Sequence, residues 1–216
     1  MNLYDISYLI VQCLMLNLVL SAIISLVFSV RFGWKSYLIP LFLTASALFE
    51  LSGYIFGKIY GNNSFIAPLF GLFDYFIWSR FFTLKKSKLR KQLFWVDIIL
   101  IVYISLELYR IYLGKGFMTI SGSSVTYLSL IIIMIYNYLT SFKIESRINW
   151  FIFSLVFVYV SFKCFFTLFI QFAVYWESEY VFLLWIPHYI LLHFFYPFLL
   201  IYLWKIGKNP QHLLFG

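Results

Sequence analysis

The length of the apolar runs, which recur along the whole chain, constrains the fold most. Each run has about 20 residues, roughly what a helix needs to cross the hydrocarbon core of a bilayer. Hydrophobic residues make up 63% of the 216 residues and charged residues 11%, against roughly 45–50% and 25% in a soluble domain. The sequence therefore predicts an all-α, polytopic integral membrane protein.

Seven spans can be drawn, with short connections that leave no room for an inserted soluble domain. Residues 1–216 are therefore predicted to form a single transmembrane domain, a seven-transmembrane-helix bundle. The expected spans are Ile6–Val30, Ser36–Phe56, Phe65–Leu84, Gln92–Tyr112, Val125–Phe142, Ile148–Val174 and Val181–Trp204.

Basic residues are distributed unequally between the two ends of these spans. One side receives eleven of the sixteen Lys and Arg residues: Arg31, Lys35, Lys85, Lys86, Lys88, Arg90, Lys91, Lys143, Arg147, Lys205 and Lys208. The other side receives Lys58 and Lys115. The positive-inside rule makes the first side cytoplasmic, which places the N-terminus outside and the C-terminus inside. A bacterial cytoplasmic (inner) membrane is the expected location.

The net charge of +8 does not indicate nucleic-acid binding, because the charge lies beside the spans and no soluble basic domain exists. The densest positive run comprises Lys85, Lys86, Lys88, Arg90 and Lys91. It is a candidate docking site for a cytoplasmic protein partner or for anionic lipid, besides the bilayer itself.

Ionisable residues at membrane depth are costly, and they usually face a bundle interior or a wet cavity. Five such residues are predicted in the outer half or near the middle of their spans: Glu50, Asp74, Lys163, His188 and His193. Two interpretations remain open for this group. Its members neutralise one another as a structural polar core, or they line a functional pocket open to the outside.

Two further pairs are predicted to be structural. Arg80 and Asp97 lie near the cytoplasmic ends of consecutive spans, where a short turn brings them together. Glu107 and Arg110 are three residues apart on one span, so they can pair along one helix face.

The two histidines of the last span do not suit a metal. His188 and His193 are five residues apart, which separates them by about 140° around a helix axis. Phosphate-binding, nucleophile-elbow and zinc-protease motifs are also missing from the sequence. No cofactor and no metal are expected. Pro197 frees the carbonyl of His193 from helical hydrogen bonding, which provides either a polar lining or a packing kink.

The stretch LFELSGYIFGKIYGNNSFIAPLFGLFDYFIWSRFF and the final LWIPHYILLHFFYPFLLIYLWK resemble small, uncharacterised seven-span membrane proteins of the Bacteroidota type. The resemblance implies that Glu50, Asp74, Trp185 and His188 are the characteristic residues that this chain shares with that family. Asp74 stands where that family more often has Glu, and Pro187 before the histidine departs from its pattern. Members of that family resemble membrane partners of signalling systems.

Three classes of function follow from these observations. The first is a sensor or signalling partner that binds a small or lipidic ligand in an outer-half polar pocket. The second is a transporter or ion-conducting membrane effector, for example of a bacterial defence system, with the buried charges as its path. The third is an intramembrane enzyme using Glu50, Asp74 and His188.

Overall fold

The computed structural model describes residues 3–32, 37–61, 63–83, 87–116, 118, 120–141, 147–173 and 178–208. These residues form seven helices: α1 (Leu3–Phe32), α2 (Leu38–Tyr60), α3 (Ile66–Thr83), α4 (Ser87–Tyr112), α5 (Gly122–Ser141), α6 (Arg147–Ala173) and α7 (Ser178–Lys208). The described ranges contain no strand, and each helix overlaps one expected span. The predicted all-α architecture is confirmed for this part of the chain.

Six helices are long and apolar enough to cross a membrane, which is the composition of an integral membrane protein. Among the seven helices described, the exception is α3, which has 18 residues and includes Asp74 and Arg80. Eleven of its residues are buried, because α2, α4 and α5 all pack against it. Since α3 faces protein on most sides, it tolerates polar side chains that lipid would not.

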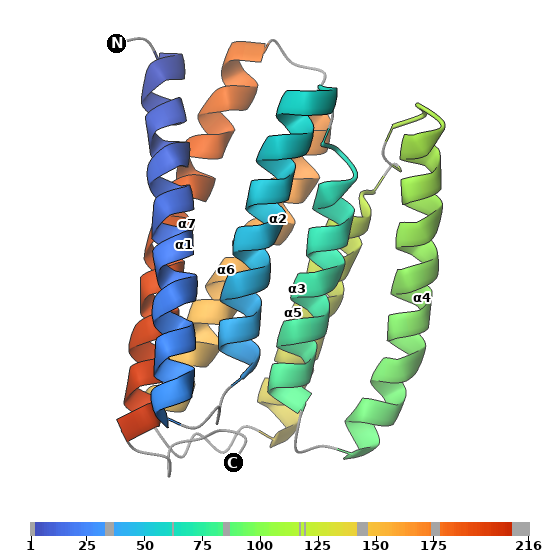
Figure 1. Cartoon of the computed structure of the whole chain (residues 1–216). Coiled ribbons are helices and arrows are strands. Elements are labelled where there is room, and N and C mark those ends of the chain that lie inside the picture. The colour runs from blue at the N-terminus through green and yellow to red at the C-terminus, as the bar shows by residue number, and fades with distance from the viewer. Residues whose placement is uncertain are drawn as a thin grey trace.

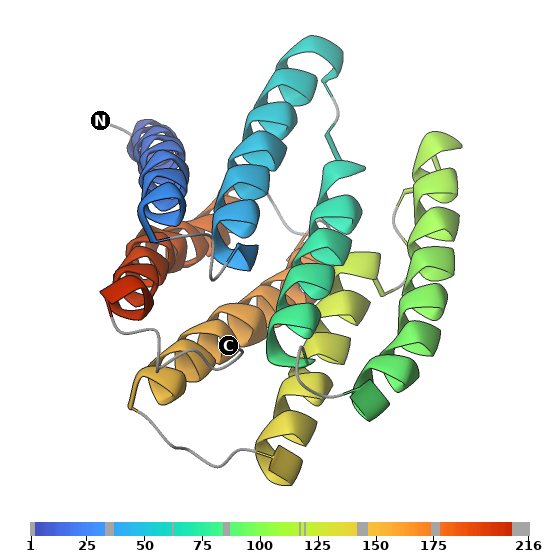
Figure 2. The ribbon, with the colours of Figure 1, turned by 60° about the horizontal axis from the view of Figure 1, so that its bottom comes forward.

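Six of the helices pack in a closed order, α1–α2–α3–α5–α6–α7, with α7 returning to α1. Successive helices run in opposite directions, so α1 begins at one end of the bundle and α7 finishes at the other (Figure 1). Helix α4 lies outside this order, and within the described residues it packs mainly against α3 and α5 (Figure 2). The interior is therefore enclosed by the six other helices.

Helices α3 and α5 approach each other closely because a glycine lies at their contact. A Cβ atom added to Gly71 would come within 2.9 Å of the Ser123 Cα atom and of the Thr126 hydroxyl oxygen. Small residues permit this kind of backbone approach between membrane helices. The contact places the next turns of the two helices, which contain Asp74 and Tyr127, beside each other.

Helices α1 and α7 are joined at the kink-forming Pro197. The Asn17 side-chain amide donates a hydrogen bond of 3.0 Å to the carbonyl of His193, the group that Pro197 leaves without a helical donor. A neighbouring helix thus satisfies the freed carbonyl, as interrupted membrane helices require. Of the two roles considered for Pro197, the structure supports the packing kink.

Four described basic residues near helix ends lie together at one end of the bundle, whereas Lys58 and Arg110 are in the last turns of α2 and α4 at the opposite end. Arg31 is in the last turn of α1, Lys91 is near the start of α4, and Lys205 and Lys208 are in the last turn of α7. We call this the basic end; in Figure 1 it is the lower one. It is the side that the positive-inside rule predicts to be cytoplasmic.

A reporter enzyme fused after Lys208 is expected to be active in the cytoplasm. The same reporter inserted at Lys115, between α4 and α5, is expected to be external, because these sites follow opposite ends of the bundle. If both fusions report the same side of the membrane, the chain between Lys115 and Lys208 cannot cross it three times, as α5, α6 and α7 are expected to do. A reversed pattern would contradict the orientation.

Candidate functional site

Asp74 is at the centre of a buried polar group that connects three helices. Its side chain on α3 is fully buried. The hydroxyls of Tyr127 on α5 and Tyr159 on α6 donate hydrogen bonds of 2.9 and 2.6 Å to the carboxylate oxygen Oδ2. The second oxygen, Oδ1, is buried and has no hydrogen-bond partner among the described residues. Oδ2 therefore accepts two hydrogen bonds, whereas Oδ1 can still accept hydrogen bonds from a further donor.

Lys163 lies beside Asp74 without pairing to it. Its side chain is 6% exposed, and Nζ lies 4.9 Å from the ring centroid of Phe70 and 5.7 Å from that of Tyr159. Its charge interacts with the carboxylates of Glu50 and Asp74. No described carboxylate comes within 4.0 Å of the ammonium, so the lysine is stabilised by aromatic faces rather than by a direct ion pair.

Glu50 of α2 and Tyr196 of α7 add two further polar side chains to the group. Glu50 on α2 is half-buried. Tyr196 on α7 is fully buried, and its hydroxyl has no hydrogen-bond partner in the described part of the chain. The hydroxyl is close enough to interact electrostatically with both Glu50 and Asp74. Two acids on different helices thus face the same interior space.

The two histidines of α7 have different surroundings. His188 is 4% exposed, and its ring is parallel to that of Phe166 at a centroid distance of 4.4 Å. It interacts electrostatically with Lys163 and so belongs to the group. His193 instead bonds through Nδ1 to the Tyr189 carbonyl of its own helix, at 2.9 Å. The contacts described for His193 do not connect it to Asp74, so its place in the group stays a prediction.

We call this set the Asp74 cluster, and it comprises Glu50, Asp74, Tyr127, Tyr159, Lys163, His188 and Tyr196. Electrostatic interactions with Lys163 connect Glu50, Asp74 and His188, and the role of these four residues as a polar core or a ligand site stays a prediction. For Trp185 the helical backbone is described, but its side chain lies outside the described residues. Within the described ranges, no three His, Cys, Asp or Glu side chains come together as a metal site would require.

A packed layer of aromatic rings lies on the basic-end side of the Asp74 cluster. In α2, α3 and α7, the residues Phe42, Trp78 and Phe195 are nearer the basic end than Glu50, Asp74 and His188. These three rings pack within 5.0–6.2 Å of one another, and the ring of Tyr159 stacks on Phe195 at 4.0 Å. We call Phe42, Trp78, Tyr159 and Phe195 the aromatic layer. All four side chains are at most 2% exposed, so the layer closes the interior below the cluster.

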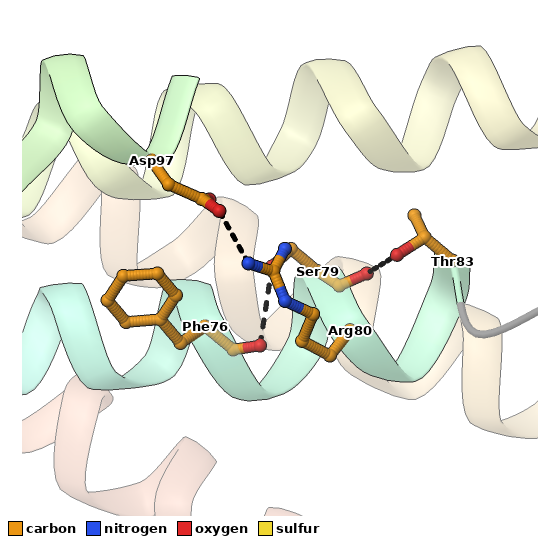
Figure 3. A network of polar contacts seen from close by, with 5 residues as sticks. All are labelled: Phe76, Ser79, Arg80, Thr83 and Asp97. Carbon is orange, nitrogen blue, oxygen red and sulfur yellow. Dashed lines mark hydrogen bonds and ion pairs between the residues drawn. The ribbon is translucent and has the colours of Figure 1, made fainter. Parts of the chain in front are cut away.

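Arg80 and Asp97 form an ion pair between α3 and α4. Figure 3 shows Arg80 Nη2 directed at Asp97 Oδ2, at 2.5 Å. The guanidinium also lies 5.8 Å from the ring centroid of Phe76. The side chain of Asp97 is 9% exposed and that of Arg80 is 34% exposed. The pair therefore fastens the peripheral helix α4 to the bundle near the basic end.

Glu107 has hydrogen-bond partners that its position in the sequence does not indicate. Its fully buried carboxylate accepts hydrogen bonds from the backbone N–H groups of Met118, at 3.3 Å, and Gly122, at 2.7 Å. Arg110 is exposed and lies beyond the 4.0 Å of a direct ion pair, although its charge interacts with the Glu107 carboxylate. A carboxylate satisfies the free N–H groups at a helix start, and the helix dipole favours its charge. Glu107 therefore joins α4 to the beginning of α5, and a structural pair with Arg110 stays a prediction.

The basic run between α3 and α4 is only partly described. Lys85 and Lys86 lie outside the described residues, and so do the side chains of Lys88 and Arg90. Lys91 is exposed. The role of this run in docking a protein or anionic lipid stays a prediction.

The three tyrosines of the Asp74 cluster do not stand out in the sequence, because aromatic residues make up 24% of the chain. One signal was present for Tyr159. It precedes Lys163 by four residues, which places both on one face of α6. Tyr127 and Tyr196 have no such neighbour, and only the packing of the helices identifies them.

Comparison of the chain with models of protein families, with curated proteins and with solved structures finds no match. The resemblance to Bacteroidota membrane proteins therefore stays a prediction. The function must be argued from the geometry of the Asp74 cluster.

Proposed function

We propose that this protein is a membrane sensor or signalling partner whose Asp74 cluster binds a small polar ligand. The observation that carries this proposal is that Asp74 Oδ1 and the hydroxyl of Tyr196, which interacts electrostatically with Asp74, are both buried without a hydrogen-bond partner among the described residues. Buried polar atoms are normally hydrogen-bonded, because an unmade bond costs about 1–3 kcal/mol. A ligand that supplies the missing bonds recovers this free energy on binding.

The chemistry of the cluster indicates which ligand groups fit. Two carboxylates, Glu50 and Asp74, face a single ammonium, Lys163. A ligand amine or hydroxyl would donate to the oxygen Oδ1 of Asp74, and an ammonium would offset the excess acid. A ligand carboxylate or carbonyl would accept from Lys163, which makes no direct ion pair with the described carboxylates. A small amine or amino acid has the matching groups.

The aromatic layer favours sensing over transport. A transporter must connect its site to each side of the membrane in turn. Below the Asp74 cluster, the stacked rings of Tyr159 and Phe195 and the adjoining Trp78 occupy the interior. On the other side, the half-buried Glu50 marks the less enclosed part of the cluster. A site closed on one side suits a ligand that enters and leaves by the other.

Asp74→Asn is expected to abolish ligand-induced stabilisation while leaving the protein folded, because the amide keeps the shape of the side chain but removes its charge. The assay is thermal unfolding of the purified chain in nanodiscs, with and without a panel of primary amines and amino acids. A ligand present at 100 times its Kd stabilises the wild-type protein by about 2.7 kcal/mol.

Thr83→Val is the control for this change, because it removes a buried hydroxyl from the same helix, nine residues beyond Asp74. It is expected to keep the ligand response. The proposal fails if no compound stabilises the wild-type protein, or if Asp74→Asn responds equally. Movement of the stabilising compound across proteoliposomes would assign transport instead.

A further inference from the structure

A groove of about 520 Å³ lies between α6 and α7, and Tyr159 of the Asp74 cluster forms part of its wall. Its walls include Trp150, Phe151, Ser154 and Val158 of α6 and Leu191 and Phe198 of α7. The volume falls within the range of roughly 300–1,000 Å³ typical of ligand sites. The lining is almost wholly apolar, and Ser154 and Val158 are exposed at the groove. Such a groove fits a hydrocarbon chain.

The groove runs inward from the basic end of the bundle. Trp150 is three residues from the start of α6, and Val158 is eight residues further along. At 1.5 Å per residue this corresponds to about 12 Å, which is most of one leaflet of a hydrocarbon core about 30 Å thick. The groove thus extends from the interface toward the membrane centre, as an acyl chain does.

A cation lies at the interfacial end of this groove. The Lys205 ammonium is 5.8 Å from the ring centroid of Phe151, one of the groove's walls. Lys205 is exposed, and no described carboxylate lies within 4.0 Å of it. A positive charge at the mouth of an apolar groove complements a lipid that has a negative headgroup above its chain.

We propose that this groove holds one acyl chain of an anionic phospholipid, whose phosphate is bound by Lys205. The lipid belongs to the leaflet at the basic end. Trp150 is 36% exposed and adjoins Phe151, the residue that Lys205 contacts. A tryptophan at this position suits the membrane interface, where the lipid headgroup begins. The site does not depend on the ligand of the Asp74 cluster, and it is independent of the sensor proposal.

Lys205→Gln is expected to lower the preference for phosphatidylglycerol over phosphatidylcholine about five-fold, which corresponds to roughly 1 kcal/mol. The experiment is native mass spectrometry of the delipidated full-length chain after addition of the two lipids in equal amounts. The wild-type protein is expected to retain one phosphatidylglycerol in preference.

Lys208→Gln is the matched control. This lysine has the same charge in the same last turn, but its ammonium lies 4.6 Å from the ring of Trp204, which packs against Phe28 of α1. It therefore faces away from the groove, and its loss is expected to leave the lipid preference unchanged. An equal loss from both lysine variants would show only general attraction to negative lipid, and it would overturn the site.

Ser154→Trp tests the groove itself, because the larger side chain fills it. Retention of both lipids is expected to fall, whereas Ile132→Trp on the exposed face of α5 is expected to retain them. Unchanged retention by Ser154→Trp, or equal retention of the two lipids by the wild-type protein, would refute the proposal. A wild-type dimer that Ser154→Trp dissociates would assign the groove to a second copy of the chain instead. Thermal unfolding of each variant confirms that it is folded.

Discussion

Trp78→Ala is expected to lower the free energy of unfolding by about 3–5 kcal/mol, the largest effect of any single change considered. The Trp78 side chain is fully buried, and its ring packs against four other rings, those of Phe42, Phe81, Phe82 and Phe195. These rings come from three helices, so a cavity at this position cannot be closed by movement of one side chain. Thermal or denaturant unfolding in detergent measures the loss.

Trp95→Ala is the matched control, because this tryptophan of α4 is 66% exposed and contributes little to packing inside the bundle. It is expected to change the stability only slightly. Equal effects of the two tryptophan changes would mean that the aromatic layer does not hold the helices together. It would also remove the argument that the layer closes the Asp74 cluster on the basic-end side.

Arg80→Ala and Asp97→Ala are each expected to lower stability by about 2–3 kcal/mol, because each change leaves one charge without its partner. Removal of one partner from a fully buried pair costs about 3–5 kcal/mol. The loss here is expected to be smaller, since the Arg80 side chain is one-third exposed and water reaches it. The destabilised state is expected to be local, with α4 detaching from α3.

The double variant Arg80→Ala/Asp97→Ala is expected to be more stable than the sum of the single losses predicts. A double-mutant cycle in detergent measures this coupling. Simple additivity would show that the two side chains do not stabilise each other, despite the contact in Figure 3. Hydrogen exchange along α4 would locate the loss, and protection lost mainly in α6 or α7 would contradict the role assigned to the pair.

The helices and their approximate ends follow from the sequence alone, because an apolar run of membrane length must satisfy its backbone hydrogen bonds within the run. This reasoning predicted seven helices and identified Glu50, Asp74, Lys163 and His188 as unusual. The closeness of Arg80 to Asp97 was also predictable, since a short turn between consecutive helices limits how far apart they can lie. Each of these inferences depends on residues that are near in sequence.

The partners of the buried groups were decided only by the tertiary structure. Most of these helices are apolar on every side, so the sequence pattern does not show which face of each packs inward. Tyr127 and Tyr159 meet Asp74 across 53 and 85 residues of chain, and no local pattern indicates such contacts. Glu107 illustrates the same limit: helical spacing predicted Arg110, but two backbone N–H groups near the start of α5 supply its hydrogen bonds. Spacing along one helix shows which residues can pair with each other. Only the packing of helices shows whether another helix or loop supplies a partner that is nearer and better shielded from water than the one on the same helix.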